Sequence, residues 1–561
     1  MPMSSSNAGR FAAALCVTLA SVANAADATV RKDLTAADLY GALQARKVAL
    51  DAAGGRVTLD PRVFTAGRDR SGVLVTDVLD VGPVAGTLAL PADMRHVTVS
   101  VEADVPAGAT LGIEARSGAT AFDQAGWGPW AWLEGAKGGT LPGTPGRYVQ
   151  IRLTLAAKDA GALPAVRSLA VEGTATPRAA APGRVAVQES AIRRIVRSPI
   201  EFLYERPDQE KLVKFRKACD LDAVVAAGKN DFEQLVRLQD WVASCPNDRH
   251  EMFDGGTPWD IDRIGRLPQE APAGAARKPV IHGHCMSYAE VMVVAASALG
   301  LKARHMAVCG FRQMSHEVVE AWVPSLRKWV YFDPSLSNYY VAKGTDEPLS
   351  LLELHDIVAR NFIPEGKDMN WFIGQNNPET RAIVKKVGGK TPLDARFAGW
   401  SYGARMKPDY DWGWLHGYLA DGFVQMTPRN DFHAHPEASP GVFGAYPGYA
   451  DYPFWVDANT PPHREVNNWF TRPRDFYWTV DEATLQLRAT EDPAVLAVEF
   501  GQCMPFFKAY RVTVDGAEVA AAATLFTWRL RPGPNRLEVA PVDEFGRTGA
   551  ASTAVVTLEK P

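Results

Sequence analysis

The sequence predicts a protein of several domains, with an α+β central part between two regions that are rich in β-strands. Three observations lead to this prediction. The chain has 561 residues, which is too long for one hydrophobic core. Apolar residues alternate with polar ones near both ends of the chain, whereas they follow a helical period in parts of the middle. Hydrophobic residues make up 47% of the chain and charged residues 22%, as in an ordinary folded protein.

The charge distribution argues against nucleic acid as a partner. The formal net charge is −4, and the sequence contains neither a basic arm nor a long block of like charges. We therefore expect no nucleic-acid partner.

The first 25 residues have the composition of a secretory signal peptide. Arg10 precedes an apolar run over 11–22, and Ala-Asn-Ala at 23–25 has the small-x-small pattern of a cleavage site. The run is too short to cross a bilayer comfortably, and no later segment approaches the length of a membrane span. We expect residues 1–25 to be removed and the mature protein to be secreted or periplasmic, without a membrane partner.

Cleavage leaves an odd number of cysteines, which are Cys219, Cys245, Cys285, Cys309 and Cys503. An odd number in an oxidising compartment indicates at least one thiol that stays free. If a disulfide forms, we expect it between Cys219 and Cys245, and we expect Cys285 to stay reduced.

Residues 26–174 contain short segments of alternating apolar and polar residues between Gly, Pro and Asp turns, as in an antiparallel β-sandwich. The clearest segments are 72–79, 96–101, 146–153 and 168–172. Ser71-Gly72, together with Gly-Arg-Tyr-Val-Gln at 146–150, resembles the jelly-roll accessory domains of secreted polysaccharide-acting proteins.

A Gly-rich connection within this region carries Trp127, Trp130 and Trp132. These rings are candidates for a platform that stacks on sugar rings. The alternative is that they pack over an edge of the sandwich.

Residues 175–188 are rich in Ala, Pro and Gly, which is typical of a linker. Beyond them, the spacing of apolar residues predicts helices over 210–217 and 231–242. Asn230 is the expected N-cap of the second helix, because its side chain can accept from the first N–H groups.

Cys285 is predicted to open a further helix. Gly283 permits a tight turn before it, and apolar residues recur at helical spacing from Tyr288 to Leu299. Unpaired N–H groups at a helix N-terminus favour a thiolate over a thiol, and the thiolate is the nucleophile. The backbone N–H of Cys285 would also point to where an oxyanion forms. The alternative is a buried structural cysteine.

His316 begins one strand-like run, and Asp333 ends the next, before Pro334. Two antiparallel strands joined by a turn at 324–327 would place the start of the first beside the end of the second. Asp333 could then hold the imidazole of His316 in one tautomer, while the other ring nitrogen faces Cys285. A core histidine and a turn aspartate are the alternatives for each residue alone. Their joint occurrence, each at the end of an element, favours a Cys-His-Asp acyl-transfer site.

This stretch resembles the transglutaminase-like superfamily. The motifs that carry the resemblance are Gly283-His284-Cys285 with Ala289, the segment 298–304, Ser315-His316-Glu317 with the segment 320–323, and Trp329 to Pro334. The resemblance implies a papain-like core in which Cys285 is the nucleophile, His316 the general base and acid, and Asp333 the orienting residue.

One motif departs from the family pattern. Members usually carry a tryptophan two residues after the histidine, whereas Trp322 stands six residues after His316. His305 is therefore the alternative base. The second oxyanion donor in such enzymes often comes from a side chain upstream, and Trp259 is the candidate here.

No metal or other cofactor is expected. His282 and His284 flank Cys285, but no third ligand follows at regular spacing, and the sequence has no Cys-x-x-Cys pair. Calcium-dependent cross-linking members exist in the superfamily, yet no Asp-rich loop predicts a calcium site.

Residues 366–471 form an aromatic, Pro-rich extension that either walls a substrate cleft or packs as a coat over the core. The candidates for substrate binding are Trp412, Trp414 and Trp455. Residues 472–561 return to alternating segments, and their Gly-rich ending is common in immunoglobulin-like sandwiches.

The expected fold is therefore α+β, with a papain-like transglutaminase core between an N-terminal jelly-roll-like β-sandwich and a C-terminal immunoglobulin-like β-sandwich. The expected divisions are a signal peptide (1–25), an accessory domain (26–174), a linker (175–188), the catalytic core (189–365), its extension (366–471) and the last sandwich (472–561).

The leading functional hypothesis is a cysteine hydrolase or acyltransferase that acts on amide bonds in a peptide or a glycoconjugate. The sequence does not distinguish water from an amine as the acyl acceptor. A second hypothesis is a carbohydrate-binding envelope protein in which the core is only a scaffold. A third is a polysaccharide-active enzyme that uses carboxylates near Trp412 and Trp414, namely Asp409, Asp411 or Asp421.

Overall fold

The structure is a computed structural model, and it describes most of the chain outside the N-terminus and the segment after α7. The described residues are 27–66, 69–135, 137–178, 185–248, 260–267, 277–308, 316–342, 345–362, 400–402, 423–431, 452–457, 466–520 and 524–559. The chain divides into two compact units. Unit 1 comprises Met1–Leu59, Gly72–Ile195 and Val480–Pro561, and unit 2 comprises Asp60–Ser71 and Val196–Thr479.

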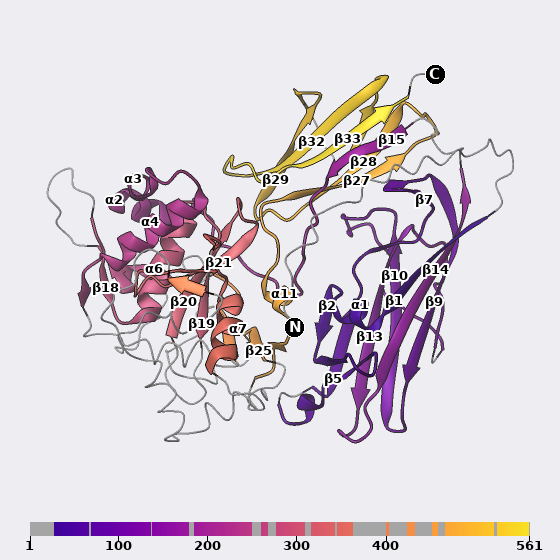
Figure 1. The fold of residues 1–561 in the computed structure, drawn as a ribbon, viewed down its shortest axis with the longest axis horizontal. Helices are drawn as coiled ribbons and strands as arrows, with labels where there is room; N and C mark the ends of the chain where they lie inside the picture. The colour runs from indigo at the N-terminus through magenta and orange to yellow at the C-terminus, as the bar shows by residue number, and fades with distance from the viewer. Residues whose placement is uncertain are drawn as a thin grey trace. The chain divides into compact units, whose positions relative to one another are not determined.

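The N-terminal part of unit 1 contains two six-stranded sheets (Figure 1). One has the order β12-β9-β14-β4-β3, with β1 also paired to β14, and the other has the order β11-β10-β13-β5-β2, with β6 also paired to β13. The elements are β1 (Ala28–Thr35), α1 (Ala36–Tyr40), β2 (Gln44–Arg46), β3 (Val48–Asp51), β4 (Arg56–Leu59), β5 (Ser71–Val75), β6 (Leu79–Asp80), β9 (Ala92–Asp104), β10 (Ala109–Gly118), β11 (Ala131–Trp132), β12 (Gly138–Thr140), β13 (Tyr148–Ala157) and β14 (Ala165–Pro177).

Two five-stranded sheets make up the rest of unit 1, and their orders are β15-β33-β32-β29-β30 and β31-β28-β27-β8-β7. Their strands are β7 (Val84–Ala85), β8 (Leu88–Ala89), β15 (Val185–Ala191), β27 (Ala483–Ala489), β28 (Val495–Gln502), β29 (Phe507–Val514), β30 (Ala517–Val519), β31 (Leu525–Arg529), β32 (Gly533–Asp543) and β33 (Ser552–Leu558). The stretch expected to be a linker has strand at both ends, because β14 runs to Pro177 and β15 begins at Val185 and pairs with β33.

Unit 2 combines a small helical group with a mainly antiparallel sheet of order β21-β20-β19-β24-β25-β26. Its elements are η1 (Pro61–Phe64), α2 (Glu210–Cys219), α3 (Leu221–Val225), α4 (Asp231–Ala243), β16 (Asn247–Asp248), α5 (Ile261–Ile264), β17 (Gly265–Arg266), β18 (Val280–His282), α6 (Cys285–Ala298), β19 (Ala303–Val308), β20 (His316–Val323), β21 (Lys328–Phe332), β22 (Tyr340–Ala342), α7 (Leu351–Phe362), β23 (Trp400–Tyr402), β24 (Phe423–Met426), β25 (Phe454–Val456), β26 (Trp469–Phe470) and α11 (Pro473–Phe476).

Helix α6 lies at the centre of the core of unit 2. Its side chains from Met286 to Ala298 are almost all buried, because the helix packs against α2 and α4 and also against β19 and β20. Figure 1 shows α2, α3 and α4 gathered beside α6. A helix that is apolar on every side is expected at such a position.

The helices predicted over 210–217 and 231–242 are confirmed as α2 and α4. The Asn230 side chain accepts a hydrogen bond from the Glu233 N–H at 2.9 Å, as an N-cap does. The disulfide expected between Cys219 and Cys245 is wrong for this structure, since both are free thiols within the apolar core. Burial raises the pKa of each thiol to about 12.

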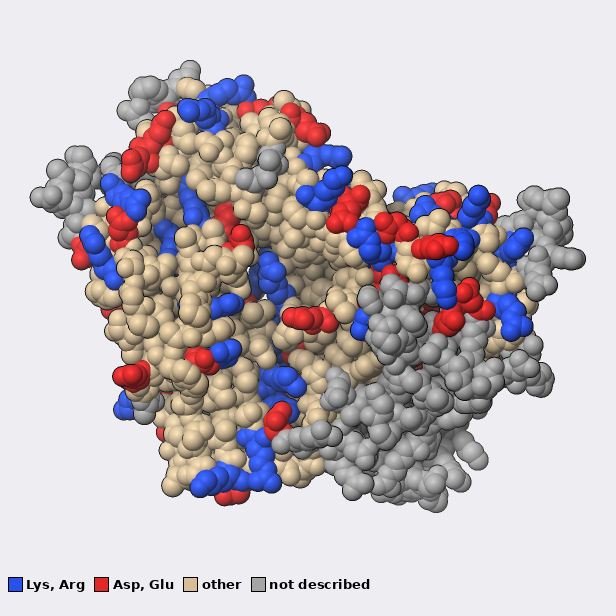
Figure 2. Space-filling view, turned by 180° about the vertical axis from the view of Figure 1, so that it is seen from behind, with Lys and Arg blue, Asp and Glu red and all other residues tan. Residues whose placement is uncertain are grey.

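Strands predominate over helices among the described residues. Over the described part of the face drawn in Figure 2, basic and acidic side chains are interspersed, and neither sign forms an extended field. Among the helices that the structure describes, none is long and apolar enough to cross a membrane.

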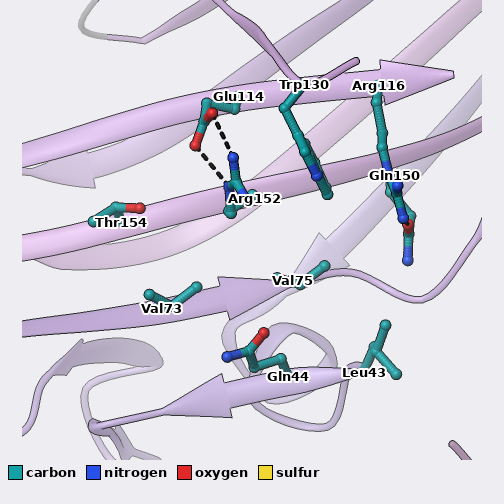
Figure 3. A pocket seen from close by; sticks show the side chains of 10 residues that line it. All are labelled: Leu43, Gln44, Val73, Val75, Glu114, Arg116, Trp130, Gln150, Arg152 and Thr154. Atoms are coloured by element: carbon teal, nitrogen blue, oxygen red, sulfur yellow. Dashed lines mark hydrogen bonds and ion pairs between the residues drawn. The ribbon is translucent and has the colours of Figure 1, made fainter. Parts of the chain in front are cut away.

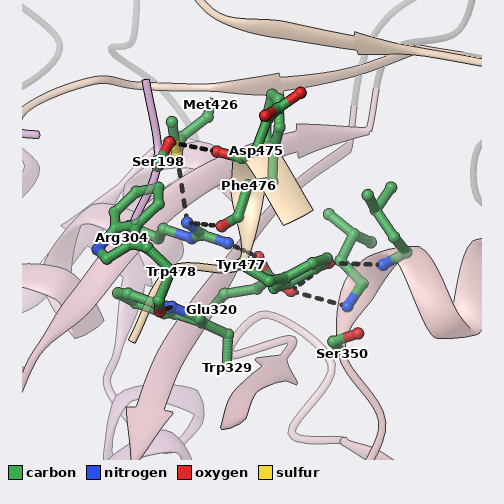
Figure 4. Close-up of polar contacts among 12 residues, drawn as sticks. Ser198, Arg304, Glu320, Trp329, Ser350, Met426, Asp475, Phe476, Tyr477 and Trp478 are labelled. Atoms are coloured by element: carbon green, nitrogen blue, oxygen red, sulfur yellow. Dashed lines mark hydrogen bonds and ion pairs between the residues drawn. The ribbon is translucent and has the colours of Figure 1, made fainter. Parts of the chain in front are cut away.

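A buried ion pair ties the middle of the unit 2 sheet to the segment around α11 (Figure 4). Arg304 on β19 donates to Glu320 on β20 at 2.7 Å, and both side chains are fully buried. The Arg304 guanidinium also donates to the Phe476 carbonyl at 2.5 Å and lies over the rings of Trp329 and Trp478, at 4.1 and 4.7 Å. Glu320 also accepts from the Leu351 N–H at 2.8 Å and from the Tyr477 hydroxyl at 2.9 Å, so both charges are paired and hydrogen-bonded.

Breaking this pair is expected to destabilise unit 2 strongly. Arg304→Met would leave Glu320 charged and buried, so we expect a loss of about 3–5 kcal/mol in the free energy of unfolding. The measurement is differential scanning calorimetry, which resolves the transitions of a chain with several units. Arg31→Met removes an exposed arginine that pairs with Asp33, and it should change stability by less than about 1 kcal/mol. Equal effects of the two substitutions would contradict this role of the pair.

Candidate active site

The turn before α6 places Cys285 at the first position of the helix. Gly283 has a φ of +114°, which side-chain-bearing residues rarely adopt, and its carbonyl accepts a hydrogen bond from the Asn247 side chain at 3.1 Å. His284 is the N-cap in extended conformation. The first N–H groups of α6 have no partner within the helix, so the half-buried thiol of Cys285 lies at its positive end.

His316 and Asp333 are brought together by the hairpin of β20 and β21. Val319 pairs with Phe332 and Val323 with Lys328, so the start of β20 lies beside the end of β21. The His316 Nε2 atom is 2.6 Å from the Asp333 Oδ2 atom. Both side chains are buried, with 2% and 0% of their surface exposed, which shields their interaction from water.

A turn fixes the orientation of the Asp333 carboxylate. Its Oδ1 atom accepts from the Ser335 N–H at 3.1 Å, from the Ser335 hydroxyl at 2.7 Å and from the Leu336 N–H at 3.1 Å. Oδ2 is thereby directed at His316, and the Tyr331 hydroxyl donates to it at 3.5 Å. Burial and the Asp333 charge raise the pKa of Tyr331 well above 10.0, so this hydroxyl stays neutral.

The site favours the charged form of His316. Burial alone would lower the pKa of His316, but the charge and hydrogen bond of Asp333, together with a hydrogen bond to Cys285, raise it well above 6.5. Cys285 is thus one of the groups that favour the charged ring. Because Nε2 is occupied by Asp333, Nδ1 is the nitrogen that remains for the thiol.

The alternative base, His305, is engaged elsewhere. Its Nδ1 atom is 2.8 Å from the Thr427 hydroxyl, and its Nε2 atom is 2.9 Å from the Glu317 carboxylate. Glu290 of α6 lies on the other side, 3.7 Å from Nδ1. Burial, partly offset by His305, raises the pKa of Glu290 to about 7.

Of the remaining residues predicted for catalysis or substrate binding, the structure describes Trp455. Trp259, Trp412 and Trp414 lie outside the described residues, as do Asp409, Asp411 and Asp421. Trp455 is in β25, where it is 4% exposed and packs edge-to-face on His355 at 4.8 Å. Within the described part of the chain, no three His, Cys, Asp or Glu side chains are placed to hold a metal ion.

The sequence did not single out the residues that orient Asp333 or those that engage His305. Ser335 follows Asp333 by two residues, as in an Asx-turn, and this spacing is visible in the sequence. Tyr331 precedes Asp333 by two residues and so shares its face of the strand. Glu290 and Glu317 carry no such local signal, because their contact with His305 depends on how α6, β19 and β20 pack.

Comparison with known proteins gives a match to one family model and weak similarities to solved structures, of which two are described. Residues 221–334 match the family model of the transglutaminase-like superfamily. The crystal structure of red sea bream transglutaminase aligns with 88% of this chain and 81% of its own, at 10% identity and a TM-score of 0.20. A provisionally named protease from Parabacteroides distasonis ATCC 8503 aligns with 50% of this chain and 68% of its own, at 10% identity and a TM-score of 0.14. No curated protein matches the chain.

Proposed function

We propose that the protein is a cysteine-dependent hydrolase or acyltransferase of amide bonds. The proposal starts from the transglutaminase-like superfamily domain at residues 221–334. The observation that carries the proposal is one imidazole shared by two partners. His316 contacts Asp333 at 2.6 Å, and Asp333 and Cys285 together raise the pKa of its imidazole well above 6.5. A nucleophile, a base and an orienting carboxylate in this order are the parts of an acyl-transfer site.

Each residue has a defined step in the proposed reaction. His316 takes the thiol proton, and the Cys285 thiolate attacks the amide carbonyl. The resulting oxyanion is stabilised by the N–H groups at the start of α6, including that of Cys285. The His316 imidazolium, stabilised by Asp333, then protonates the leaving amine, and the acyl group stays on Cys285 as a thioester.

The second half-reaction decides between hydrolysis and transfer. Neutral His316 removes a proton from water or from an amine, which attacks the thioester and releases Cys285. We propose peptides or glycoconjugates as substrates, met outside the cytoplasm, because the first 25 residues have the pattern of an export signal.

Trapping of the thioester tests this function. The full chain would be incubated with a panel of peptide amides and glycopeptides, quenched in acid and analysed by intact mass. We expect an acyl adduct on Cys285 that hydroxylamine removes, and we expect its decay to quicken if an added primary amine is the acceptor. The proposal is rejected if no substrate in the panel gives a thioester adduct, or if the adduct still forms in Cys285→Ala. Either result would favour a core that serves as a scaffold.

The pH dependence of kcat/KM should follow the ionisation of the His316 imidazole. Its raised pKa means that the imidazolium needed to protonate the leaving amine persists well above pH 6.5, and the rate falls only when pH passes through this raised value. The stability that the charged histidine contributes is likewise present below pH 6.5 and lost through the same range. A pH–rate profile measures this. Asp333→Asn should shift the alkaline limb to lower pH, and an unshifted limb would contradict the assignment.

A further inference from the structure

A second site lies in unit 1, on the face of the β10–β13 sheet that does not contribute to the core. The opposite face of these strands holds buried apolar residues such as Ile113, Ile151 and Leu153. The outward face carries a cavity of about 540 Å³, lined by residues from β2, β5, β10 and β13 and by Trp130 (Figure 3). We call it the Arg116 cavity.

The charges in the Arg116 cavity do not balance. Its lining includes three ionisable side chains, Glu114, Arg116 and Arg152. Glu114 and Arg152 face each other across the strands and form a two-bonded pair at 2.6 and 2.7 Å. This pair neutralises itself, so the lining retains one positive charge, which is that of Arg116.

Arg116 is held by neutral groups only. Its guanidinium donates to the side-chain oxygens of Gln150 and Gln124, each at 2.6 Å. Gln150 is itself fixed, because it is 1% exposed and its amide donates to the Thr76 carbonyl at 3.1 Å. Burial and the charge of Arg152 lower the pKa of Arg116, as expected for a cation that lacks an acidic neighbour.

Trp130 does not offer a face for stacking on sugar rings. Its ring lies between the two arginines in Figure 3, with Arg116 at 4.7 Å and Arg152 at 4.4 Å from the ring centre. The indole therefore fixes the two guanidinium groups. Trp130 thus separates two cations and does not act as the stacking platform considered from the sequence.

We propose that the Arg116 cavity binds an acidic carbohydrate chain through the carboxylate of one sugar unit. Gln150 and Gln124 accept from Nε and Nη2 of Arg116, so Nη1 is the group that can donate a charge-assisted hydrogen bond to a carboxylate. Gln44 and Thr154 supply an amide and a hydroxyl group for sugar hydroxyls, and Val73 and Val75 supply an apolar floor. A peptide would need backbone partners, but β13 is hydrogen-bonded along the sheet to β10 and β5, which leaves side chains to make the recognition.

The binding test uses the full chain and matched ligands. Oligomers of galacturonate, mannuronate and glucuronate would be titrated calorimetrically, alongside the methyl ester of oligogalacturonate, which keeps the rings and removes the charge. We expect at least one uronate to bind and the ester to bind about 10-fold or more weakly. Binding should be unchanged in Cys285→Ala, which separates this site from the cysteine chemistry.

Single substitutions test whether the uronate binds in the Arg116 cavity. Arg116→Gln should weaken uronate binding about 10-fold or more, and Arg116→Lys should weaken it less, because the charge remains but the planar guanidinium that Gln150 and Gln124 orient is lost. Arg167→Gln is the control, since it removes an equally charged side chain that pairs with Asp104 away from the cavity. Should Arg116→Gln fail to fold, Glu114→Gln tests the same idea in the opposite direction, because removal of the negative charge should tighten binding.

Three results would overturn the proposal. The first is that no uronate binds, or that the ester binds as well as the acid. The second is that polyglutamate binds and the uronates do not, which would indicate an acidic peptide. The third is that Arg167→Gln weakens binding as much as Arg116→Gln.

Discussion

Replacing Cys285 with alanine is expected to lower kcat/KM for amide cleavage by about 10⁴-fold or more. In the proposed reaction the thiol at the start of α6 carries the acyl intermediate, and alanine removes it while adding no bulk. The fold should persist, since Cys285 is half-buried at the helix end and does not belong to the core of α6. Steady-state kinetics on the substrate found by thioester trapping would measure the loss.

Cys503→Ala provides the matched control for this experiment. Cys503 is also a half-exposed free cysteine, but it lies in unit 1. We expect its replacement to leave kcat/KM within a factor of about two, because it belongs to the other unit and takes no part in the proposed reaction. Retention of activity by Cys285→Ala would move the chemistry away from this site altogether.

Asp333→Asn is expected to lower kcat by about 10³- to 10⁴-fold. The side-chain oxygen of asparagine can still accept from Ser335, so the turn survives and the amide group faces His316. An amide there donates to Nε2 and forces the ring proton onto Nδ1, which can then no longer take the thiol proton. The charge that stabilises the imidazolium is also lost.

The kinetic comparison is with Tyr331→Phe. This change removes a hydroxyl that donates to the same carboxylate oxygen, at the longer distance of 3.5 Å, and it leaves the charge of Asp333 in place. We expect a decrease of less than about 10-fold in kcat. If Asp333→Asn were as mild as Tyr331→Phe, the carboxylate would be a structural turn residue and the role proposed for it would be wrong.

The proximity of His316 and Asp333 could be predicted from the sequence because it follows from local rules. A four-residue turn between two strands aligns the start of one with the end of the other, whatever the rest of the chain does. The helical start at Cys285 also follows from a glycine and an apolar period. Each of these features depends on residues that are close in the chain.

Contacts between distant parts of the chain could not be predicted. Arg304 stands in a recognisable motif, yet its contacts with Phe476 and Trp478 join residues more than 170 positions apart. The two guanidinium groups around Trp130 depend in the same way on the register of β10 against β13. The pattern of tryptophans alone left both sugar stacking and packing over the sandwich edge open, whereas the structure places Trp130 between two cations.

The central claim is that Cys285 and His316 work as one unit, and the rate of alkylation of Cys285 tests it most directly. Wild-type protein, His316→Ala and His305→Ala would be treated with iodoacetamide across pH 5–9, and peptide mass mapping would report the modification of Cys285 alone. The account predicts fast alkylation of the wild type at pH 6, well below the value of about 8.5 at which an ordinary thiol ionises. His316→Ala should slow this reaction about 10-fold or more, and His305→Ala should not. Slow alkylation of the wild type, or equal rates in wild type and His316→Ala, would contradict the claim.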